Sequence, residues 1–470
     1  MLGKWITRHK NIILLIACVL LVPSVIGYVS TRVNYDVLSY LPNTLETVSG
    51  QDTLVDEFGM GAFSMIVVED MSNKQAAALE KKIEGIDHVK DVLWYDDMLD
   101  ISVPTEMLPK NLEEAFFNGN ATMMIALFDD TTSADDTMDA ITNIRKTVGK
   151  DVYASGMSGI VTDIKNLALQ EMPIYVVIAA VLSLVVLLIT MDSFLTPFIF
   201  LANIGMAIVF NLGSNIFLGE ISYITQALAA VLQLAVTMDY SIFLLESYEA
   251  NKKRFPDDRK RAMAHAISNT FKSVSSSSVT TIAGFVALCF MTFKLGANIG
   301  IVMSKGVVIG VITCVTVLPA MILTFDNAIE KTTHKALIPP LTKVSDFIVK
   351  HYKIAIVVFL VLLGPAIYGN SNYKIYYNID QGLPKNIPSA EANDKLKEHF
   401  NMSNVHMVLL KDGLSAKDKN QMIKKIEKVD GVKWVIGLNS LVGPNFPETM
   451  IPEDVKSMLK TDKYELQFVC

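Results

Sequence analysis

Long apolar runs along the chain are separated by polar stretches of very different length. Seven runs are apolar enough, and close enough to about 20 residues or longer, to cross a bilayer as helices. They occupy Asn11–Val29, Pro173–Met191, Phe194–Leu218, Ile221–Ser247, Thr270–Phe293, Ala297–Phe325 and Ile354–Gly369. The first run is too long for the apolar part of a signal peptide, and no small-residue cleavage site follows it. The pattern therefore predicts an uncleaved anchor and six further membrane helices.

Basic residues between the runs predict which side of the membrane each polar segment faces. The loop predicted at 249–272 contains two basic clusters, and the linker 327–353 is rich in lysine. Short loops rich in lysine and arginine stay on the cytoplasmic side. A cytoplasmic N-terminus places both segments there. The two long polar segments, 30–172 and 370–470, are then expected outside the cytoplasm.

The polar segment between the first two runs has the composition of a soluble domain. Short β-rich stretches alternate in it with amphipathic, helix-like stretches. The predicted strands are Phe63–Glu69, Val89–Tyr95, Ala121–Asp129 and Val152–Ser155, and the predicted helices are Asn73–Gly85, Pro109–Gly119 and Ser133–Val148. This order of elements predicts a ferredoxin-like α+β domain.

The chain also repeats itself. Leu41-Pro42 recurs as Leu383-Pro384, and the segment Ile83–Lys90 recurs as Ile426–Lys433. We therefore interpret the chain as one complete unit (helix, outer domain, five helices) and the start of a second. The second copy stops at Cys470, opposite the third strand of the first copy. Since parallel repeats of membrane transporters come in complete pairs, we favour truncation of a longer chain over a natural half-protein.

These observations predict six segments. They are membrane helix 1 with a cytoplasmic N-terminus at 1–31, an extracytoplasmic domain at 32–172, membrane helices 2–6 at 173–326, a cytoplasmic linker at 327–353, membrane helix 7 at 354–369, and the incomplete second outer domain at 370–470.

Composition supports a membrane protein and excludes several other classes. The chain is 51% hydrophobic and 19% charged, with a mean hydropathy of +0.38. A net charge of −7 leaves no basic footprint for nucleic acid. The sequence lacks a phosphate-binding glycine loop and a nucleophile elbow. Its histidines and cysteines are not spaced as the ligands of a metal ion are. We therefore expect neither an enzyme, nor a cofactor, nor a metal.

One acidic residue stands out inside the apolar runs. Asp239 lies in the fourth run with apolar residues on both sides, and Tyr240 follows it with a hydroxyl group. A carboxylate inside a bilayer is costly and usually marks a functional site such as a proton relay. We favour this relay for Asp239 and Tyr240. The alternative is that Asp239 only forms polar contacts that hold neighbouring helices together. Consecutive helical residues are expected to face different neighbours.

Three further polar residues within the runs are weaker candidates. Gln233 is expected to line a polar seam or to join helices, and Ser276 belongs to a Ser/Thr-rich stretch that favours close helix packing. Lys305 is expected either to pair with a carboxylate or to extend toward the membrane surface. Asparagines in the third run, among them Asn211 and Asn215, are interpreted as packing groups.

Four segments carry a family resemblance. They are the stretch LAVTMDYSIFLLESYEA (Leu234–Ala250), the basic segment that follows it, the Ser/Thr-rich start of the fifth run with Gly284, and Thr316–Ile322 (TVLPAMI). With the helix–outer domain–five-helix repeat, the chain resembles the MmpL type of the resistance–nodulation–division (RND) superfamily. The resemblance implies a polytopic α-helical membrane protein with ferredoxin-like porter domains and an incomplete second repeat. It also implies that Asp239 and Tyr240 face a second such pair, expected near position 582, beyond Cys470.

The functional hypothesis is a proton-driven exporter in the cell membrane, represented by its N-terminal portion. Its expected partners are membrane lipids, a hydrophobic, amphiphilic or lipid substrate, protons, and a missing second half supplied by the same longer chain or by a partner subunit. One alternative is a protein-secretion accessory of the same superfamily. A second is a receptor or scaffold that transports nothing, and a third is a half-transporter that dimerises.

Overall fold

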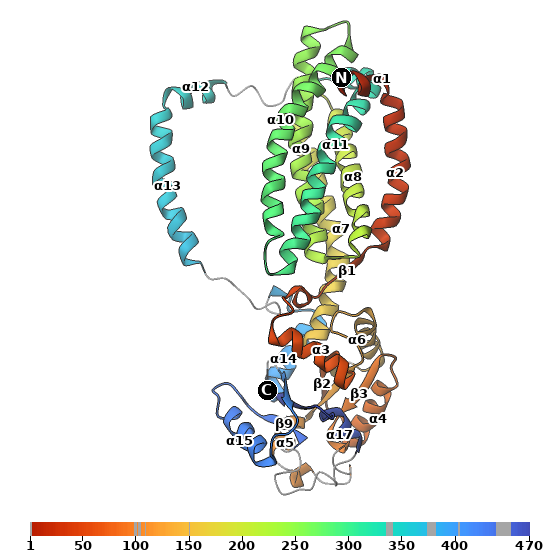
Figure 1. Ribbon diagram of the computed structural model, residues 1–470, viewed down its shortest axis with the longest axis vertical. Helices are drawn as coiled ribbons and strands as arrows, with labels where there is room; N and C mark the ends of the chain where they lie inside the picture. Colours follow the sequence, from red (N-terminus) through yellow and green to blue (C-terminus); the bar gives the residue numbers. More distant parts are fainter. Residues whose placement is uncertain are drawn as a thin grey trace. The chain divides into compact units, whose positions relative to one another are not determined.

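The computed structural model describes residues 2–97, 101, 105–108, 110–149, 151–334, 342–373, 382–402, 405–438 and 453–470. Parts of the predicted linker 327–353 and of the predicted segment 370–470 lie outside these residues. The chain forms two compact units (Figure 1). The helical unit contains Met1–Val33, Met172–Met291 and Gly296–Ile379, and the α+β unit contains Asn34–Glu171, Thr292–Leu295 and Asp380–Cys470.

The helical unit is built from the predicted apolar runs. Its helices are α1 (Leu2–Arg8), α2 (Lys10–Ser30), the later part of α7 (Met157–Thr190), α8 (Thr196–Gly213), α9 (Tyr223–Arg254), α10 (Arg259–Leu288), α11 (Lys294–Lys331), α12 (Thr342–Lys350) and α13 (Tyr352–Asn372). Among the described residues, six helical stretches are long and apolar enough to cross a membrane, namely α2, α7, α8 with its continuation to Leu218, α9, α11 and α13. The fifth predicted run falls on α10, whose hydroxyl and charged residues make it less apolar than those six.

The predicted loop at 249–272 is wrong. Helix α9 continues to Arg254 and α10 begins at Arg259, so most of this basic segment is helical. Asp258 caps α10, because its carboxylate accepts a hydrogen bond from the backbone N–H of Arg261 at 2.9 Å. A helix need not end where its apolar residues end, since water can hydrate charged side chains on its last turns.

Glycines set the closest approach between neighbouring helices of this unit. Helix α2 packs against α8, α8 against α9, and α9 against α10 (Figure 1). A Cβ atom on Gly213 would lie 2.0 Å from the carbonyl oxygen of Ser24, and one on Gly27 would lie 2.2 Å from that of Gly213. Only glycine allows the two backbones to come this close, as is common where membrane helices pack. Helix α13, in contrast, has no buried residue.

A five-stranded antiparallel sheet forms the centre of the α+β unit. Strands β3 (Val89–Leu93), β5 (Ala121–Phe128), β2 (Ala62–Glu69) and β6 (Val152–Ser155) follow one another across it, and β4 (Phe117–Asn118) pairs with β5. The helices of this part are α3 (Glu46–Phe58), α4 (Asn73–Glu84), α5 (Lys110–Phe116) and α6 (Asp135–Thr147). Every residue of β5 is buried. The β-α-β-β-α-β succession of the main elements agrees with the prediction. Two short strands, β1 (Arg32–Asn34) and β7 (Glu220–Ser222), lie outside this sheet.

The second polar segment contains elements at matching positions. Glu46 and Pro388, which begin α3 and α14 (Pro388–Phe400), are 342 positions apart. The residues after these helices, Gly59 and Asn401, both have left-handed backbones, with φ of 60° and 47°. Strands β8 (His406–Lys411), β10 (Tyr464–Val469) and β9 (Val435–Gly437) are ordered as β2, β5 and β3 are. Two further helices in the described part of this segment are α15 (Ala416–Ile426) and α17 (Glu453–Leu459).

Candidate functional site

Helix α9 divides its side chains between a buried face and an exposed face. Gln233, Thr237 and Leu244 are buried, whereas Ala235 and Glu246 are exposed. This division follows the helical period, in which residues three, four and seven apart share a face. The exposed face also contains Leu232, Asp239 and Phe243. Asp239 therefore lies on an otherwise mostly apolar face of the helical unit.

The carboxylate of Asp239 has no partner in the described part of the chain. No described side chain or backbone N–H forms a hydrogen bond or ion pair with it, although α8 and α10 pack against the same helix. The described contacts thus do not support the alternative, in which Asp239 only holds helices of this chain together. The side chain is available to lipid, to another helix or to a proton.

Tyr240 faces the opposite way, as expected for consecutive helical residues. It is only 4% exposed and belongs to the same buried cluster as Leu244 and Leu318. The aromatic ring is therefore anchored within the unit, while the neighbouring carboxylate points out of it. The pair does not form a single local cluster.

Ser276 lies at nearly the same depth as Asp239. Because α9 and α10 run antiparallel from a short connection, residues equally far from that connection are at similar depth. Asp239 lies 15 residues before Arg254, and Ser276 lies 17 residues after Arg259. The difference corresponds to about 3 Å along the helix axes. Ser276 is exposed, as are Ser277 and Thr280. These hydroxyl groups make α10 polar at the depth of the carboxylate.

Lys305 is held by neutral oxygen atoms. Its Nζ atom donates to the carbonyl oxygen of Asn211 at 2.8 Å, to Oγ of Ser214 at 2.8 Å and to Oδ1 of Asn215 at 2.6 Å. The expected pairing with a carboxylate is wrong, since the described partners are neutral oxygen atoms; the expected extension toward the membrane surface stays a prediction. The three donors of an ammonium group are satisfied by the end of α8 and the 3₁₀ turn that continues it (Ser214–Leu218).

Gln233 connects this lysine cluster to α9. Its Oε1 atom accepts a hydrogen bond from Nδ2 of Asn211 at 2.9 Å, and its Nε2 atom donates to the carbonyl oxygen of Gly306 at 3.3 Å. Gln233 and Asp239 are six positions apart, or about 9 Å along the axis. The structure therefore brings Gln233 and Lys305 together and leaves Asp239 and Ser276 outside their cluster.

Sequence reasoning missed the oxygen atoms that hold Lys305. Asn211, Ser214 and Asn215 recur at spacings of three and four residues, which places them on one helical face. That spacing was the available signal. The packing role first inferred for the asparagines does not describe Asn215, because its amide oxygen accepts a charged hydrogen bond.

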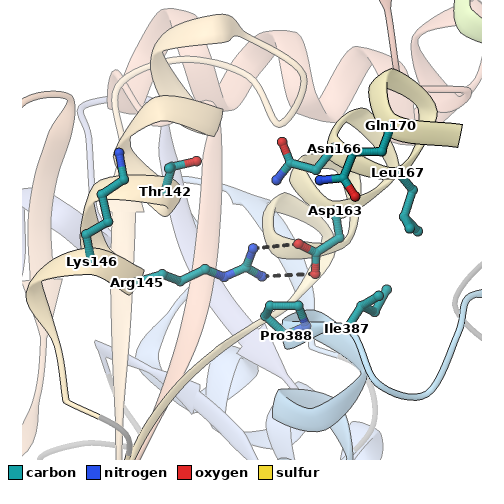
Figure 2. A pocket seen from close by; sticks show the side chains of 9 residues that line it. All are labelled: Thr142, Arg145, Lys146, Asp163, Asn166, Leu167, Gln170, Ile387 and Pro388. Atoms are coloured by element: carbon teal, nitrogen blue, oxygen red, sulfur yellow. Dashed lines mark hydrogen bonds and ion pairs between the residues drawn. The ribbon is translucent and has the colours of Figure 1, made fainter. Parts of the chain in front are cut away.

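A second candidate site lies within the α+β unit. A cavity of about 360 Å³ is lined by α6, the first turns of α7 and the residues at the start of α14. Figure 2 shows the Arg145 guanidinium facing the Asp163 carboxylate, with N–O distances of 2.6 and 3.2 Å. Asp163 also accepts a hydrogen bond from the backbone N–H of Ser389 at 2.7 Å. The Asp163 carboxylate is thus satisfied and joins three elements, whereas Nε of Arg145 is buried without a described partner. The exposed Lys146 is a further charge beside the cavity.

A family comparison identifies the chain. Residues 55–338, which include Asp239, Tyr240 and Lys305, match the MMPL family. The chain belongs to the MMPL family. This finding confirms the resemblance inferred from Leu234–Ala250. The family match and the six apolar helices together identify the chain as a multi-pass membrane protein of the RND superfamily.

Several curated proteins are similar to the chain over part of their length. Siderophore exporter MmpL5 of Mycobacterium tuberculosis is 23% identical over 320 residues, which cover 65% of this chain and 33% of that protein. Probable transport protein MmpL12 of the same species is 23% identical over 315 residues, or 64% of this chain and 27% of that protein. Putative membrane protein MJ1562 of Methanocaldococcus jannaschii is 33% identical over 91 residues, or 19% of this chain and 23% of that protein. The matches span about a third or less of these relatives.

Proposed function

We propose that this MMPL chain is the N-terminal portion of a proton-driven exporter of lipids or other hydrophobic or amphiphilic molecules. The observation that carries the proposal is the position of Asp239, an unpartnered carboxylate on the exposed face of α9. Two similar proteins are named as an exporter and a probable transport protein, and the substrate named for the first is a siderophore.

Protonation of Asp239 is the step that couples proton flow to movement. An ionised carboxylate disfavours contact between this face of α9 and lipid or an apolar helix, and the neutral acid removes that penalty. The two protonation states therefore favour different packing of α9, and proton binding shifts the balance between them. Tyr240, anchored behind the carboxylate, keeps this part of the helix in a fixed orientation.

The proposed relay needs a second half. The matching positions of α3 and α14, and the equal order of β2-β5-β3 and β8-β10-β9, support an internal repeat of which the second copy is incomplete here. A complete second copy would supply a helix equivalent to α9. We propose that this helix, in the same longer chain or in a partner subunit, covers the exposed face that holds Asp239 and contributes its own acidic residue.

The proposed topology places the N-terminus in the cytoplasm and the α+β unit outside it. Basic residues at the end of α9 and the start of α10 support this orientation under the positive-inside rule. Substrate would then leave the membrane or its outer leaflet and pass along the α+β units. Protons move in the opposite direction, down their gradient.

Replacement of Asp239 tests the proposal. In the full-length protein reconstituted into vesicles, Asp239→Asn should abolish both substrate export and proton uptake driven by an imposed pH gradient. The amide has nearly the same shape but cannot release a proton. Asp239→Glu should retain part of the activity, because it keeps the ionisable group.

Glu246 supplies the matched control. It lies on the same exposed face, seven positions along α9 and next to the end of the fourth apolar run, so Glu246→Gln removes an acidic group from the same face away from the proposed relay. This variant should transport at close to the normal rate. Undiminished export by Asp239→Asn would reject the relay, and equal loss in both variants would show that any charge on this face is required.

A further inference from the structure

Three carboxyl groups meet in the α+β unit, on elements that do not line the cavity of Figure 2. Glu80 comes from α4, and Asp96 and Asp97 follow β3 in a short turn of 3₁₀ helix (Tyr95–Asp97). One oxygen atom from each of the three lies within 4.8 Å of the other two. The group therefore brings carboxyl side chains of α4 and of the turn after β3 together.

The cluster lacks the hydrogen-bond donors that would stabilise it as an anion. Glu80 is only 3% exposed, and no described residue donates to its Oε1 atom. The Oδ1 atom of Asp96 is likewise buried without a partner in the described structure. Asp97 has one donor, the backbone N–H of Trp94, at 2.9 Å. Buried polar atoms are almost always paired, so unpaired carboxylate oxygens that converge on one point indicate a ligand.

The surroundings add negative rather than positive charge. Asp96 and Asp97 place further carboxyl groups directly beside the buried Glu80. Glu84 and Asp91 contribute further negative charge to the same region. Among the described ion pairs, none brings a lysine or arginine to Glu80, Asp96 or Asp97. A bound cation would supply the missing positive charge.

From this geometry we infer that Glu80, Asp96 and Asp97 form a binding site for a divalent cation, with Ca²⁺ as its ligand. Calcium binds carboxylate oxygens at about 2.3–2.6 Å, so oxygen ligands on opposite sides of the ion lie about 4.6–5.2 Å apart. The three oxygen atoms lie close enough together to contact one such ion. Magnesium needs shorter distances and a stricter octahedral arrangement, which three side chains from two elements satisfy less readily.

The site goes beyond the proposed export function and is independent of Asp239. The expected topology places the α+β unit outside the cytoplasm, where calcium is available. A bound ion would fix α4 against the turn that follows β3, and so stiffen one edge of the sheet. Its expected role is to stabilise the α+β unit rather than to take part in chemistry.

Terbium luminescence tests the site in the full chain, purified in detergent and stripped of metal with a chelator. Tb³⁺ is a probe for calcium sites, and Trp94 lies beside this one because its backbone contacts Asp97. Excitation of tryptophan should give saturable luminescence with one ion per chain. Added Ca²⁺ should displace the probe at lower concentration than Mg²⁺ does.

Two variants and a control identify the ligands. Glu80→Gln and Asp97→Asn should each weaken Ca²⁺ binding on the order of tenfold or more, since affinity depends on the charge of the ligand set. Asp139→Asn, at an exposed position on α6, should bind as the unmodified chain does. Without metal, Glu80→Gln should melt at or above the normal temperature, because the amide cannot ionise beside Asp96 and Asp97, and calcium should no longer raise that temperature.

Absence of sensitised luminescence, or binding that Glu80→Gln leaves unchanged, would overturn the inference. The cluster would then be held by shared protons alone. A variant that fails to fold is recognised by its melting curve, and Asp97→Asn provides the independent measurement in that case. None of these outcomes depends on transport, so the cation site and the proton relay can fail separately.

Discussion

Lys305 shows how one charged side chain is accommodated among apolar helices. Its three donors reach Asn211 on α8 and Ser214 and Asn215 in the turn that follows α8, so the lysine joins α11 to this part of the chain without a carboxylate. Replacing it by methionine, which has a similar length, leaves the Oδ1 atom of Asn215 without this donor. We expect Lys305→Met to lower the free energy of unfolding by about 1–3 kcal/mol. Thermal melting in detergent measures the change.

A second substitution separates the hydrogen bonds from the loss of volume. When both partners are replaced by apolar groups, the cost of an unsatisfied atom disappears. Lys305→Met combined with Asn215→Leu should therefore melt closer to the unmodified chain than Lys305→Met alone. If the single variant already melts normally, the cluster contributes nothing to stability and serves another purpose.

At the scale of residues, the sequence was most informative inside the membrane. A charged or amide side chain is conspicuous in an apolar run, and Asp239, Gln233 and Lys305 were found for that reason. Their partners were not, because hydrogen bonds between α8, α9 and α11 depend on how the helices rotate against one another. In the α+β unit, acidic residues are ordinary, so nothing marked Glu80 and Asp97 as neighbours.

At the scale of elements, the packing of α2 against α8 depends on glycine. A Cβ atom on Gly213 would lie 2.0 Å from the backbone carbonyl oxygen of Ser24, which cannot move like a side chain. Gly213→Ala must therefore separate the two helices. We expect a loss of about 1–3 kcal/mol in the free energy of unfolding, as for other overpacked sites. Thermal melting in detergent measures this loss.

Gly205 gives the control on the same helix. A Cβ atom there would meet nothing within 4 Å, so Gly205→Ala should be neutral or stabilising, because alanine favours a helix over glycine. Equal melting temperatures for the two alanine variants would mean that α2 and α8 do not approach closely in the membrane.

Elements were easier to predict than their ends. All seven predicted runs fall on helices, because about 20 apolar residues leave few other structures in a bilayer. The basic segment at 249–272 was misjudged, since polarity indicates where a helix leaves lipid and not where it ends. Likewise α7 begins at Met157, before the apolar run at Pro173, because its first turns belong to the α+β unit.

At the scale of the whole molecule, the second polar segment is joined to the first within the α+β unit. Helix α14 packs against β2 and β6, far from it in sequence. Lys395 and His399 on this helix both contact Oε1 of Glu69 at the end of β2, the lysine at 2.9 Å. Self-comparison of the sequence predicted that this segment resembles the first, but it could not predict which surfaces meet, since repeats can pack in several ways.

Glu69 makes this junction sensitive to acid. Burial raises its pKa, but the hydrogen bonds and charges of Lys395 and His399 outweigh that effect and hold the pKa below its ordinary value of 4.5. A carboxylate with a lowered pKa stabilises the folded state above its ordinary pKa, and this contribution is lost as pH falls through the folded value. Hydrogen exchange of α14 should therefore accelerate below about pH 4.5 more than exchange of β5 does. Glu69→Gln should remove that pH dependence, whereas Glu171→Gln, an exposed residue of α7, should leave it intact. If α14 keeps its acid response in Glu69→Gln, another group controls the junction.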